Sequence, residues 1–223
     1  MSVKISIILR TYNNGELLKK AVESALNQSF NAYEIVLIDD GSTDNTKDLL
    51  NTFNNQKLRI FHQENKGMIQ AGYDGLKEAK GGFVCFLDGD DEFGTSLLSE
   101  LFASLIESND AIFAYSDYIE KNLANGEEKI ISCENIFNTL ACGVLWKKCF
   151  LDKFGFWDTS MIFPEHDFLL KVLNKNYKGV HVAKPLWTYN KHASSFTANK
   201  EKVEKGKHQL FKKYGDLAGF KDY

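Results

Sequence analysis

The sequence lacks the features that would assign its 223 residues to a specialised class of protein. It has four cysteines, but no two of them form a C-x-x-C pair, which argues against a zinc site and a dense disulfide framework. Its formal net charge is −3, so no long-range field attracts a polyanion, and we expect no nucleic-acid partner. The first apolar run ends at Leu9 and is too short for a signal peptide or a membrane span, which favours a cytoplasmic location.

The chain also lacks an internal repeat, a low-complexity tract and a linker rich in Pro, Gly and Ser. Hydrophobic residues make up 43% of it, and charged residues of both signs are spread along its length, as in an ordinary globular protein. We therefore expect a single domain over residues 1–223.

The first 108 residues alternate short apolar runs with amphipathic segments. Four runs are short enough for buried strands and rich in Val, Ile, Leu and Phe: Val3–Leu9, Glu34–Ile38, Leu58–His62 and Phe83–Leu87. Helices are expected between them over Glu16–Gln28, from an N-cap at Ser42 or Thr43 to about Phe53, and over Met68–Ala79. This order predicts parallel strands with right-handed crossovers, in an open α/β sheet that has helices on both faces.

The regular alternation ends after a helix that we expect over Ser96–Glu107. In the second half, an antiparallel hairpin is expected, with strands at Ala111–Glu120 and Lys129–Ser132 and a turn at Asn125-Gly126. It is followed by a helix at Asp167–Leu173 and short strands at Val180–Ala183 and Leu186–Tyr189. A lysine-rich helix is expected over Asn199–Lys213. The sheet therefore becomes mixed. The lysine-rich helix fits either a solvated surface helix or a peripheral contact with a membrane at its inner face.

Polar residues follow all four expected strands of the first half, at Arg10–Asn13, Asp39–Ser42, Gln63–Lys66 and Asp88–Asp91. In open α/β sheets, ligands bind outside the carboxyl ends of the strands. Surface loops are polar too, but the polarity of loops does not explain why acidic residues follow two strands that end at the same edge. We expect the functional site at this edge, covered by the second half of the chain.

The acidic run Asp88, Asp90, Asp91 and Glu92 places four carboxylates within five residues, directly after a buried strand. Repulsion and partial burial both oppose their ionisation, so a cation is expected beside them. Mn²⁺ or Mg²⁺ fits, because such a cation takes one or two carboxylates and fills its shell with substrate phosphate oxygens. Asp88 and Asp90 are alternate residues and can face one site. The alternative is a solvated turn in which Asp91 caps the next helix.

Asp39 and Asp40 form a second acidic pair, after the second strand. One of them can accept a hydrogen bond from a uracil N–H or a ribose hydroxyl. An Asx turn with an N-cap explains Ser42 but gives no reason for the two adjacent aspartates. Tyr12, after the first strand, fits either stacking on a base or ordinary packing.

Together these segments resemble the family 2 glycosyltransferases, which have the GT-A fold. The segments that carry the resemblance are Ile5–Asn13, Glu34–Asp44, Asn65–Gly75, Ala79–Gly82 and Phe86–Asp91, with weaker similarity over Gly143–Asp158, Pro164–Lys171 and Tyr189–His192. The resemblance covers nearly the whole chain. It implies a Rossmann-like, mostly parallel sheet flanked by helices, with a nucleotide-sugar-binding half over residues 1–108 and an acceptor-side half over residues 109–223.

The resemblance also implies an activity. It is the inverting transfer of a sugar from a nucleotide-diphosphate sugar, a UDP-sugar, to a hydroxyl of a glycan or lipid-linked acceptor in surface polysaccharide or glycoconjugate synthesis. Mn²⁺ or Mg²⁺ neutralises the departing diphosphate. The donor-binding residues carried over are Thr11, Tyr12, Asp40, Lys66, Asp88 and Asp90, and the metal ligands are Asp88, Asp90, Asp91 and His192.

The catalytic base is implied to lie just before the helix that contains Lys171. Counting back from Lys171, which stands where the family has Arg, favours Glu165 as the base, whereas a gap of one residue favours Asp167. Partial burial is needed to raise the pKa of that carboxylate. A departure from the family is Gly72, where many relatives have an arginine that contacts diphosphate; Lys66, Arg10 or Lys191 are the candidates to supply that charge.

Two other functions are alternatives to the glycosyltransferase. One is a nucleotide-sugar-binding module without catalysis of its own, such as a subunit of a larger synthase. The other is a nucleotidyltransferase, which normally has a Gly-rich phosphate loop after the first strand. The segment Arg10–Gly15 contains a single glycine and argues against that activity.

Overall fold

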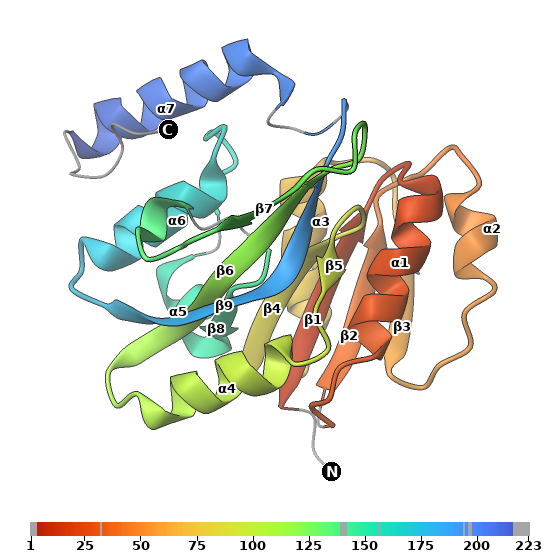
Figure 1. The fold of residues 1–223 in the computed structure, drawn as a ribbon, viewed down its shortest axis with the longest axis horizontal. Helices are drawn as coiled ribbons and strands as arrows, with labels where there is room; N and C mark the ends of the chain where they lie inside the picture. The colour runs from red at the N-terminus through yellow and green to blue at the C-terminus, as the bar shows by residue number, and fades with distance from the viewer. Residues whose placement is uncertain are drawn as a thin grey trace.

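The computed structural model describes residues 4–31, 33–138, 142–155, 157–193, 195 and 198–215. Within these ranges one nine-stranded sheet runs through the molecule in the order β3-β2-β1-β4-β8-β6-β9-β5, and β7 pairs with β6 outside this path. Figure 1 shows α1 in front of the sheet and α3 behind it. The expected α/β sheet with helices on both faces is confirmed.

Four parallel strands form the N-terminal part of the sheet: β1 (Ile5–Thr11), β2 (Tyr33–Asp39), β3 (Leu58–His62) and β4 (Phe83–Asp88). Every residue of β1 and β2 is buried, as in a parallel sheet covered on both faces. β1, β2 and β4 extend past their expected ends, because the ladder continues through the pairs Arg10–Asp88 and Thr11–Asp39. Arg10 and Thr11 therefore lie within β1, not after it.

The helices of the first half are α1 (Gly15–Leu26), α2 (Thr46–Leu50), α3 (Met68–Glu78) and α4 (Leu97–Glu107). Three of them match the expected segments closely, and α2 does not. The expected N-cap at Ser42 or Thr43 is wrong, since α2 begins at Thr46 and ends at Leu50. The physical reason is that Ser42 Oγ accepts a hydrogen bond from the Asn13 N–H instead, and Asp44 Oδ1 accepts one from the Thr46 N–H.

Alternation along β1 decides which of its side chains face α3. Ile8 and Arg10 are two residues apart and so share one face of the sheet. A Cβ at Gly75 of α3 would lie 2.5 Å from Ile8, and a Cβ at Gly72 would lie 3.2 Å from Cδ of Arg10. The absence of side chains at these two positions lets α3 approach β1 closely.

The second half adds strands to the same sheet: β5 (Glu92–Phe93), β6 (Ala111–Asn122), β7 (Glu128–Ile131), β8 (Leu145–Lys147) and β9 (Lys178–Lys191). The expected β6–β7 hairpin is antiparallel, as predicted, and a 3₁₀ turn follows at Ile136–Asn138. The two expected short strands near the end are one strand, β9, whose pairing with β6 shifts register around Pro185. The short strands β5 and β8 were not predicted, because two or three residues carry no periodic signal.

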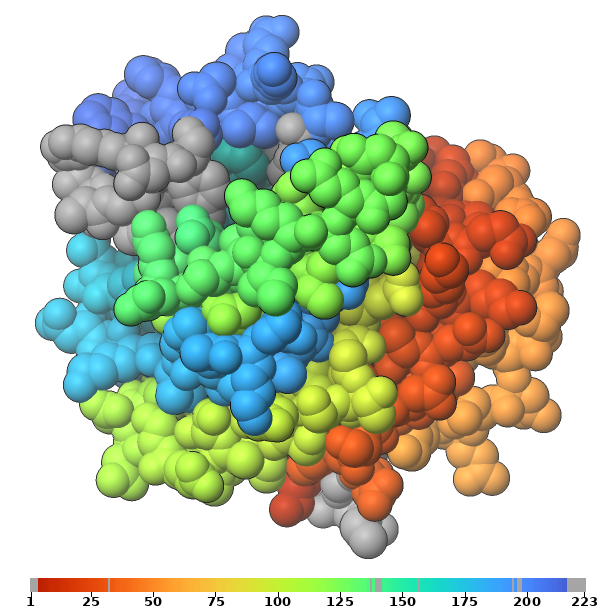
Figure 2. All heavy atoms as spheres, viewed as in Figure 1, coloured from red at the N-terminus to blue at the C-terminus, as the bar shows by residue number. Residues whose placement is uncertain are grey.

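Three helices complete the second half: α5 (Lys148–Phe154), α6 (Pro164–Leu173) and α7 (Lys200–Tyr214). The sequence placed the start of α6 at Asp167, but the helix starts at Pro164, whose fixed φ suits the first helical turn. Figure 2 shows α7 at one end of the molecule, near the β6–β7 hairpin. No helix in the described part of the chain is both long and apolar enough to span a membrane.

Candidate active site

A cavity of about 1570 Å³ opens at the carboxyl ends of β1, β2 and β4. It lies where the sequence places the site, and residues of the second half such as Pro164 and Ser195 contribute to its wall. Seven of the candidate residues line it: Thr11, Tyr12, Asp40, Lys66, Asp88, Asp90 and Asp91. The remaining candidates, His192, Glu165 and Asp167, do not belong to the cavity wall and are described below.

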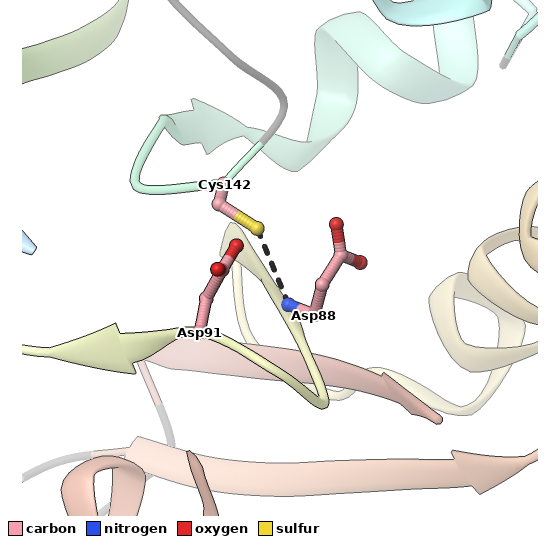
Figure 3. A group of neighbouring side chains, drawn as sticks. All are labelled: Asp88, Asp91 and Cys142. Atoms are coloured by element: carbon pink, nitrogen blue, oxygen red, sulfur yellow. Dashed lines mark hydrogen bonds between the residues drawn. The ribbon is translucent and has the colours of Figure 1, made fainter. Parts of the chain in front are cut away.

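The acidic run forms a tight turn at the end of β4. The Asp91 N–H donates to the Asp88 carbonyl at 3.1 Å. Cys142 projects toward this turn with Asp88 and Asp91 on either side, as Figure 3 shows, and its Sγ accepts a hydrogen bond from the Asp88 N–H at 3.2 Å. One ligand atom from each of these three residues lies within 4.8 Å of the others. Sequence reasoning missed Cys142, because a lone cysteine carries no motif.

Burial and mutual repulsion shift the ionisation of this run. The pKa of Asp91 is raised well above its usual value, first by burial and then by the charges of Asp90 and Asp88. The pKa of Asp90 is also raised, by burial and by Asp88, although a hydrogen bond with His192 opposes the shift. Burial keeps the pKa of the Cys142 thiol high as well, so this group is a thiol at neutral pH. Carboxylates held together against their own repulsion fit a hard divalent cation, whereas a neutral thiol does not suit one.

Residues of β9 and the segment after it hold the acidic run in place. His192 Nε2 lies 3.0 Å from Asp90 Oδ2, so the expected metal-site histidine does reach the run. Asn190 donates from its backbone to Asp91 Oδ1 and from its side chain to the Asp90 carbonyl. The Asn190 side chain also donates to Glu92, which explains why this buried residue needs an amide. In the sequence, Asn190 is marked only by its place in the weaker motif Tyr189–His192.

Asp40 organises the loop between β3 and α3, which borders the cavity. Its Oδ1 accepts hydrogen bonds from the Gln63 side chain at 2.7 Å and from the Lys66 N–H at 3.0 Å, and its Oδ2 accepts from the Gly67 N–H at 2.8 Å. A carboxylate has about four lone-pair sites, so one position on Oδ2 is left for a ligand N–H or hydroxyl. Asp40 thus shapes the loop and still faces the cavity.

Two exposed apolar side chains also border the cavity. Tyr12 is 47% exposed and Met68 is 40% exposed, and both line it. Large apolar groups that stay in water beside a cavity are available to pack against a ligand such as a nucleobase. Lys66 lies on the same side, with its Nζ 3.8 Å from Asp74 of α3.

Arg10 is the buried cation of the site. Its Nε donates to Asp88 Oδ1 at 2.9 Å, and its Nη2 donates to the same oxygen. Its Nη1 lies 3.7 Å from Glu165 Oε1. Of the cations considered for the charge missing at Gly72, Arg10 and Lys66 line the cavity, whereas Lys191 pairs with Glu120.

Glu165 and Asp167 occupy the first turn of α6 but have different partners. Glu165 contacts Arg10, and its pKa is raised mainly by burial, against the opposing effect of the Arg10 charge. Asp167 is 3% exposed and turns toward α7, where Lys213 Nζ lies 2.7 Å from its Oδ1 and the Tyr214 hydroxyl donates to that oxygen at 2.9 Å. Glu165 therefore contacts a residue that lines the cavity, whereas the Asp167 carboxylate pairs with α7.

The family follows from a comparison with known proteins. The model of the family described as "Glycosyl transferase family 2" matches residues 6–184. The chain belongs to glycosyl transferase family 2. The family resemblance drawn from the sequence is thereby confirmed, over most of the chain.

Two relatives show how far the similarity extends in this family. One is "UDP-Glc:alpha-D-GlcNAc-diphosphoundecaprenol beta-1,3-glucosyltransferase WfaP" of Escherichia coli, which is 31% identical over 205 residues, or 89% of this chain and 81% of its own length. The other is "Glycosyltransferase GlyG" of Streptococcus pneumoniae serotype 4, which is 35% identical over 129 residues, or 56% of this chain. That match covers only 42% of the pneumococcal protein.

Solved structures of two glycosyltransferases have the same fold. The structure of S. aureus TarS in complex with UDP-GlcNAc superposes with a TM-score of 0.75 at 20% identity, over 97% of this chain and 68% of that one. The mannosyltransferase PcManGT from Pyrobaculum calidifontis, in complex with GDP-Man and Mn²⁺, also gives a TM-score of 0.75, at 16% identity over 96% of this chain and 64% of its own. At these identities the likeness establishes the GT-A fold, as the sequence predicted.

Proposed function

We propose that this chain is an inverting, metal-dependent glycosyltransferase. In this proposal it transfers a sugar from a UDP-sugar to a hydroxyl of a glycan or lipid-linked acceptor, in surface polysaccharide or glycoconjugate synthesis. The observation that carries the proposal is a single cavity that combines the acidic run around Asp90 with the nucleotide-side residues Tyr12 and Asp40. Carboxylates for a diphosphate-bound cation and groups for a nucleobase are thus brought to one place.

The donor would lie with its base between the apolar groups Tyr12 and Met68, near the Oδ2 atom of Asp40. A carboxylate selects a ligand N–H, which the imide of uracil offers. Thr11 and Lys66 would complete the donor-binding side, and residues 1–108 would form the donor half of a single domain. The relative WfaP is named for UDP-glucose, and the TarS structure holds UDP-GlcNAc, which supports a uridine nucleotide here.

The metal would be held by Asp90, with Asp88, Asp91 and His192 as further candidate ligands. A divalent cation supplies charge neutralisation of the departing diphosphate. Burial and the charges of neighbouring aspartates raise the pKa values of Asp90 and Asp91, so a bound cation would favour their carboxylate forms. The Mn²⁺ in the PcManGT structure supports a divalent cation in a protein of this fold.

Glu165 would act as the base, and we prefer it to Asp167. In the transfer, the acceptor oxygen attacks C1 of the sugar from the face opposite the leaving group, the bond between C1 and the diphosphate oxygen breaks, and Glu165 takes the hydroxyl proton. Burial raises the pKa of Glu165 and so strengthens it as a base. Asp167 would instead anchor α7, because Lys213 and Tyr214 already occupy its carboxylate.

The direct test is release of UDP from UDP-glucose. The assay uses Mn²⁺ and a GlcNAc-diphosphate acceptor that carries a short lipid, followed by NMR of the product to establish inversion at C1. Asp90→Ala is expected to lower the rate by at least about 100-fold, with Asp48→Ala on the exposed face of α2 as the matched control. Undiminished activity of Asp90→Ala, or of the wild type after complete removal of metal, would refute the metal-dependent mechanism.

The alternative, a binding module without catalysis, makes a different prediction in the same assay. It would bind UDP-sugar tightly and release no UDP with any acceptor. The relatives named above are described as glycosyltransferases, which does not favour that alternative.

Peripheral association with an anionic membrane is a further part of the proposal, because a lipid-linked acceptor lies at a membrane surface. On α7, Lys200 and Lys212 are exposed, and Phe211 is 53% exposed. Lysines beside an exposed aromatic ring favour binding to anionic lipid. Co-sedimentation with vesicles of phosphatidylglycerol, and none with phosphatidylcholine vesicles, is the expected result; equal failure with both would refute this part.

A further inference from the structure

Arg10 lines the cavity, yet its charged side chain is almost fully buried. The exposed fraction of this side chain is 1%. The guanidinium carbon lies 5.5 Å from the centre of the Phe86 ring and 5.0 Å from that of Trp157, so aromatic faces enclose it. A buried arginine is costly unless its nitrogens find anionic partners. The anionic partners of Arg10 therefore indicate its role.

The first partner is Asp88, on the neighbouring strand. Both Nε and Nη2 donate to the same oxygen, Oδ1. Among the described residues, no group donates a hydrogen bond to the other oxygen, Oδ2, and the Asp88 side chain is 25% exposed. Arg10 thus fixes the Asp88 carboxylate by one oxygen and leaves the second for the donor or its cation.

The second partner is Glu165, on α6. Arg10 Nη1 and Glu165 Oε1 lie 3.7 Å apart, and neither atom has a hydrogen-bond partner among the described residues. Both atoms are buried, so the attraction between their charges is weakly screened. The Glu165 side chain as a whole is 15% exposed, and Oε1 is a buried oxygen of it.

The space that Arg10 occupies depends on Gly72. A Cβ at this position would lie 2.9 Å from Trp157, 3.2 Å from Arg10 Cδ and 3.4 Å from Arg10 Nη1. Any side chain at position 72 would push Arg10 or Trp157 aside. The position of Arg10 on β1 therefore requires glycine at position 72 of α3, because a side chain there would occupy the same space.

We propose that Arg10 is a positioning residue that ties the donor-side carboxylate Asp88 to the acceptor-side carboxylate Glu165. The inference rests on the proposed function, in which Glu165 takes the acceptor proton. One planar guanidinium serves both carboxylates from separate nitrogens, so the first turn of α6 is set relative to the end of β4. A lysine carries its N–H donors on one nitrogen atom and lacks the planar fork that reaches Asp88 and Glu165 from separate nitrogens.

The first test measures the contact without any assay of activity. Unfolding in urea is followed for the wild type, Arg10→Lys, Glu165→Gln and the double variant. We expect the effects on the unfolding equilibrium constant to be non-additive by about threefold or more, because the two groups interact directly. Additivity within about twofold would overturn the proposal.

The chain offers a matched control in its second arginine, Arg59. This residue also links two carboxylates, Glu34 at 3.2 Å and Glu78 at 2.9 Å, but it is remote from the cavity. Arg59→Lys makes the same chemical change, and its effect is expected to add to that of Glu165→Gln. Equal non-additivity between Arg59→Lys and Glu165→Gln would show that the effect is not specific to the contact between Arg10 and Glu165, and would overturn the proposal.

The second test separates positioning from a merely structural role. Arg10→Lys is expected to lower kcat about 10- to 100-fold, since a small misplacement of a catalytic group has effects of this size. Binding of UDP with Mn²⁺, measured by calorimetry, is expected to weaken by a smaller factor than kcat, because a lysine ammonium can still pair with Asp88. Unchanged kcat, or a loss of UDP binding equal to the loss of kcat, would overturn the proposal.

Gly72→Ala provides a second variant if Arg10→Lys does not fold. It keeps the Arg10 charge but crowds the side chain. We therefore expect kcat to fall more than the affinity for UDP, by a smaller factor than in Arg10→Lys. Gly82→Ala is the control, because a Cβ there meets nothing within 4 Å. A wild-type protein without transfer activity would instead refute the proposed function, and the unfolding measurements would still decide whether Arg10 holds Glu165.

Discussion

At the scale of single residues, the two candidate carboxylates of α6 have opposite surroundings. Glu165 and Asp167 are two positions apart at the start of α6, so their side chains leave the helix about 200° apart. One reaches Arg10 and the other reaches α7. Near neighbours in sequence thus have different partners, because the helix directs their side chains to different sides.

The raised pKa of Glu165 predicts the pH dependence of transfer. The base is active as a carboxylate, and burial raises the pKa at which this form is lost. The pH profile of kcat/KM is therefore expected to fall on its acid side at a pH above the ordinary glutamate value of about 4.3. A profile that stays level down to that pH would contradict Glu165 as the base.

Substitution distinguishes the two carboxylates directly. Glu165→Gln is expected to lower kcat about 100- to 10,000-fold, because the amide cannot take a proton. Asp167→Asn, measured beside it in the UDP-release assay, is expected to keep kcat within about threefold of the wild type while lowering thermal stability. The reverse pattern would identify Asp167 as the base.

At the scale of the elements, α7 is attached to the rest of the protein by contacts of α6 and the segment before it. Leu210 packs with Met161 and Leu170 in a small core of its own. A Cβ at Gly206 would lie 2.4 Å from the Phe163 ring, which shows how closely the helix sits. The buried carboxylate of Asp167 adds polar contacts at the end of α7, so stability there depends on pairing that charge.

Two lysines of α7 allow a matched test of this attachment. Lys213 and Lys205 each lie 2.7 Å from a carboxylate oxygen, but the side chain of Asp167 is 4% exposed and that of Glu201 is 79% exposed. Lys213→Met is expected to lower the free energy of unfolding by about 1–3 kcal/mol, because it leaves a buried charge with one partner fewer. Lys205→Met is expected to change it by less than about 0.5 kcal/mol. Equal effects in urea denaturation would contradict this account.

At the scale of the whole molecule, the two halves of the chain share one sheet. β8 pairs with β4, and β9 pairs with β5, so strands of the second half adjoin strands that carry the acidic run. The site is therefore assembled only when both halves are folded. A ligand that binds this site stabilises the fold as a unit.

This coupling predicts a thermal shift. UDP with Mn²⁺ at about 100 times its Kd is expected to add about 2.7 kcal/mol of stability, which raises Tm by roughly 5–10 °C for a chain of this length. ADP with Mn²⁺ serves as the control for the base. A shift of equal size with ADP would contradict selection of uracil, and a full shift in Asp90→Ala would contradict the metal site.

The sequence by itself determined the parallel core, most of the helices, the family and the edge of the sheet where the site lies. Periodicity and strand-end composition are local properties, so they can be read without coordinates. Asp88, Asp90 and Asp91 of the acidic run, with Tyr12 and Asp40, were found in this way, and all five line the cavity. Elements of two or three residues, such as β5 and β8, left no local signal.

Only the tertiary structure decided which groups meet. Asn190 and Cys142 contact the acidic run from segments more than fifty residues away, and no pattern in the sequence indicates these contacts. The different partners of Glu165 and Asp167, and the fit of Arg10 against Gly72, likewise arise from packing between distant elements. Contacts of this kind depend on how helices and strands approach one another, which a local pattern does not specify.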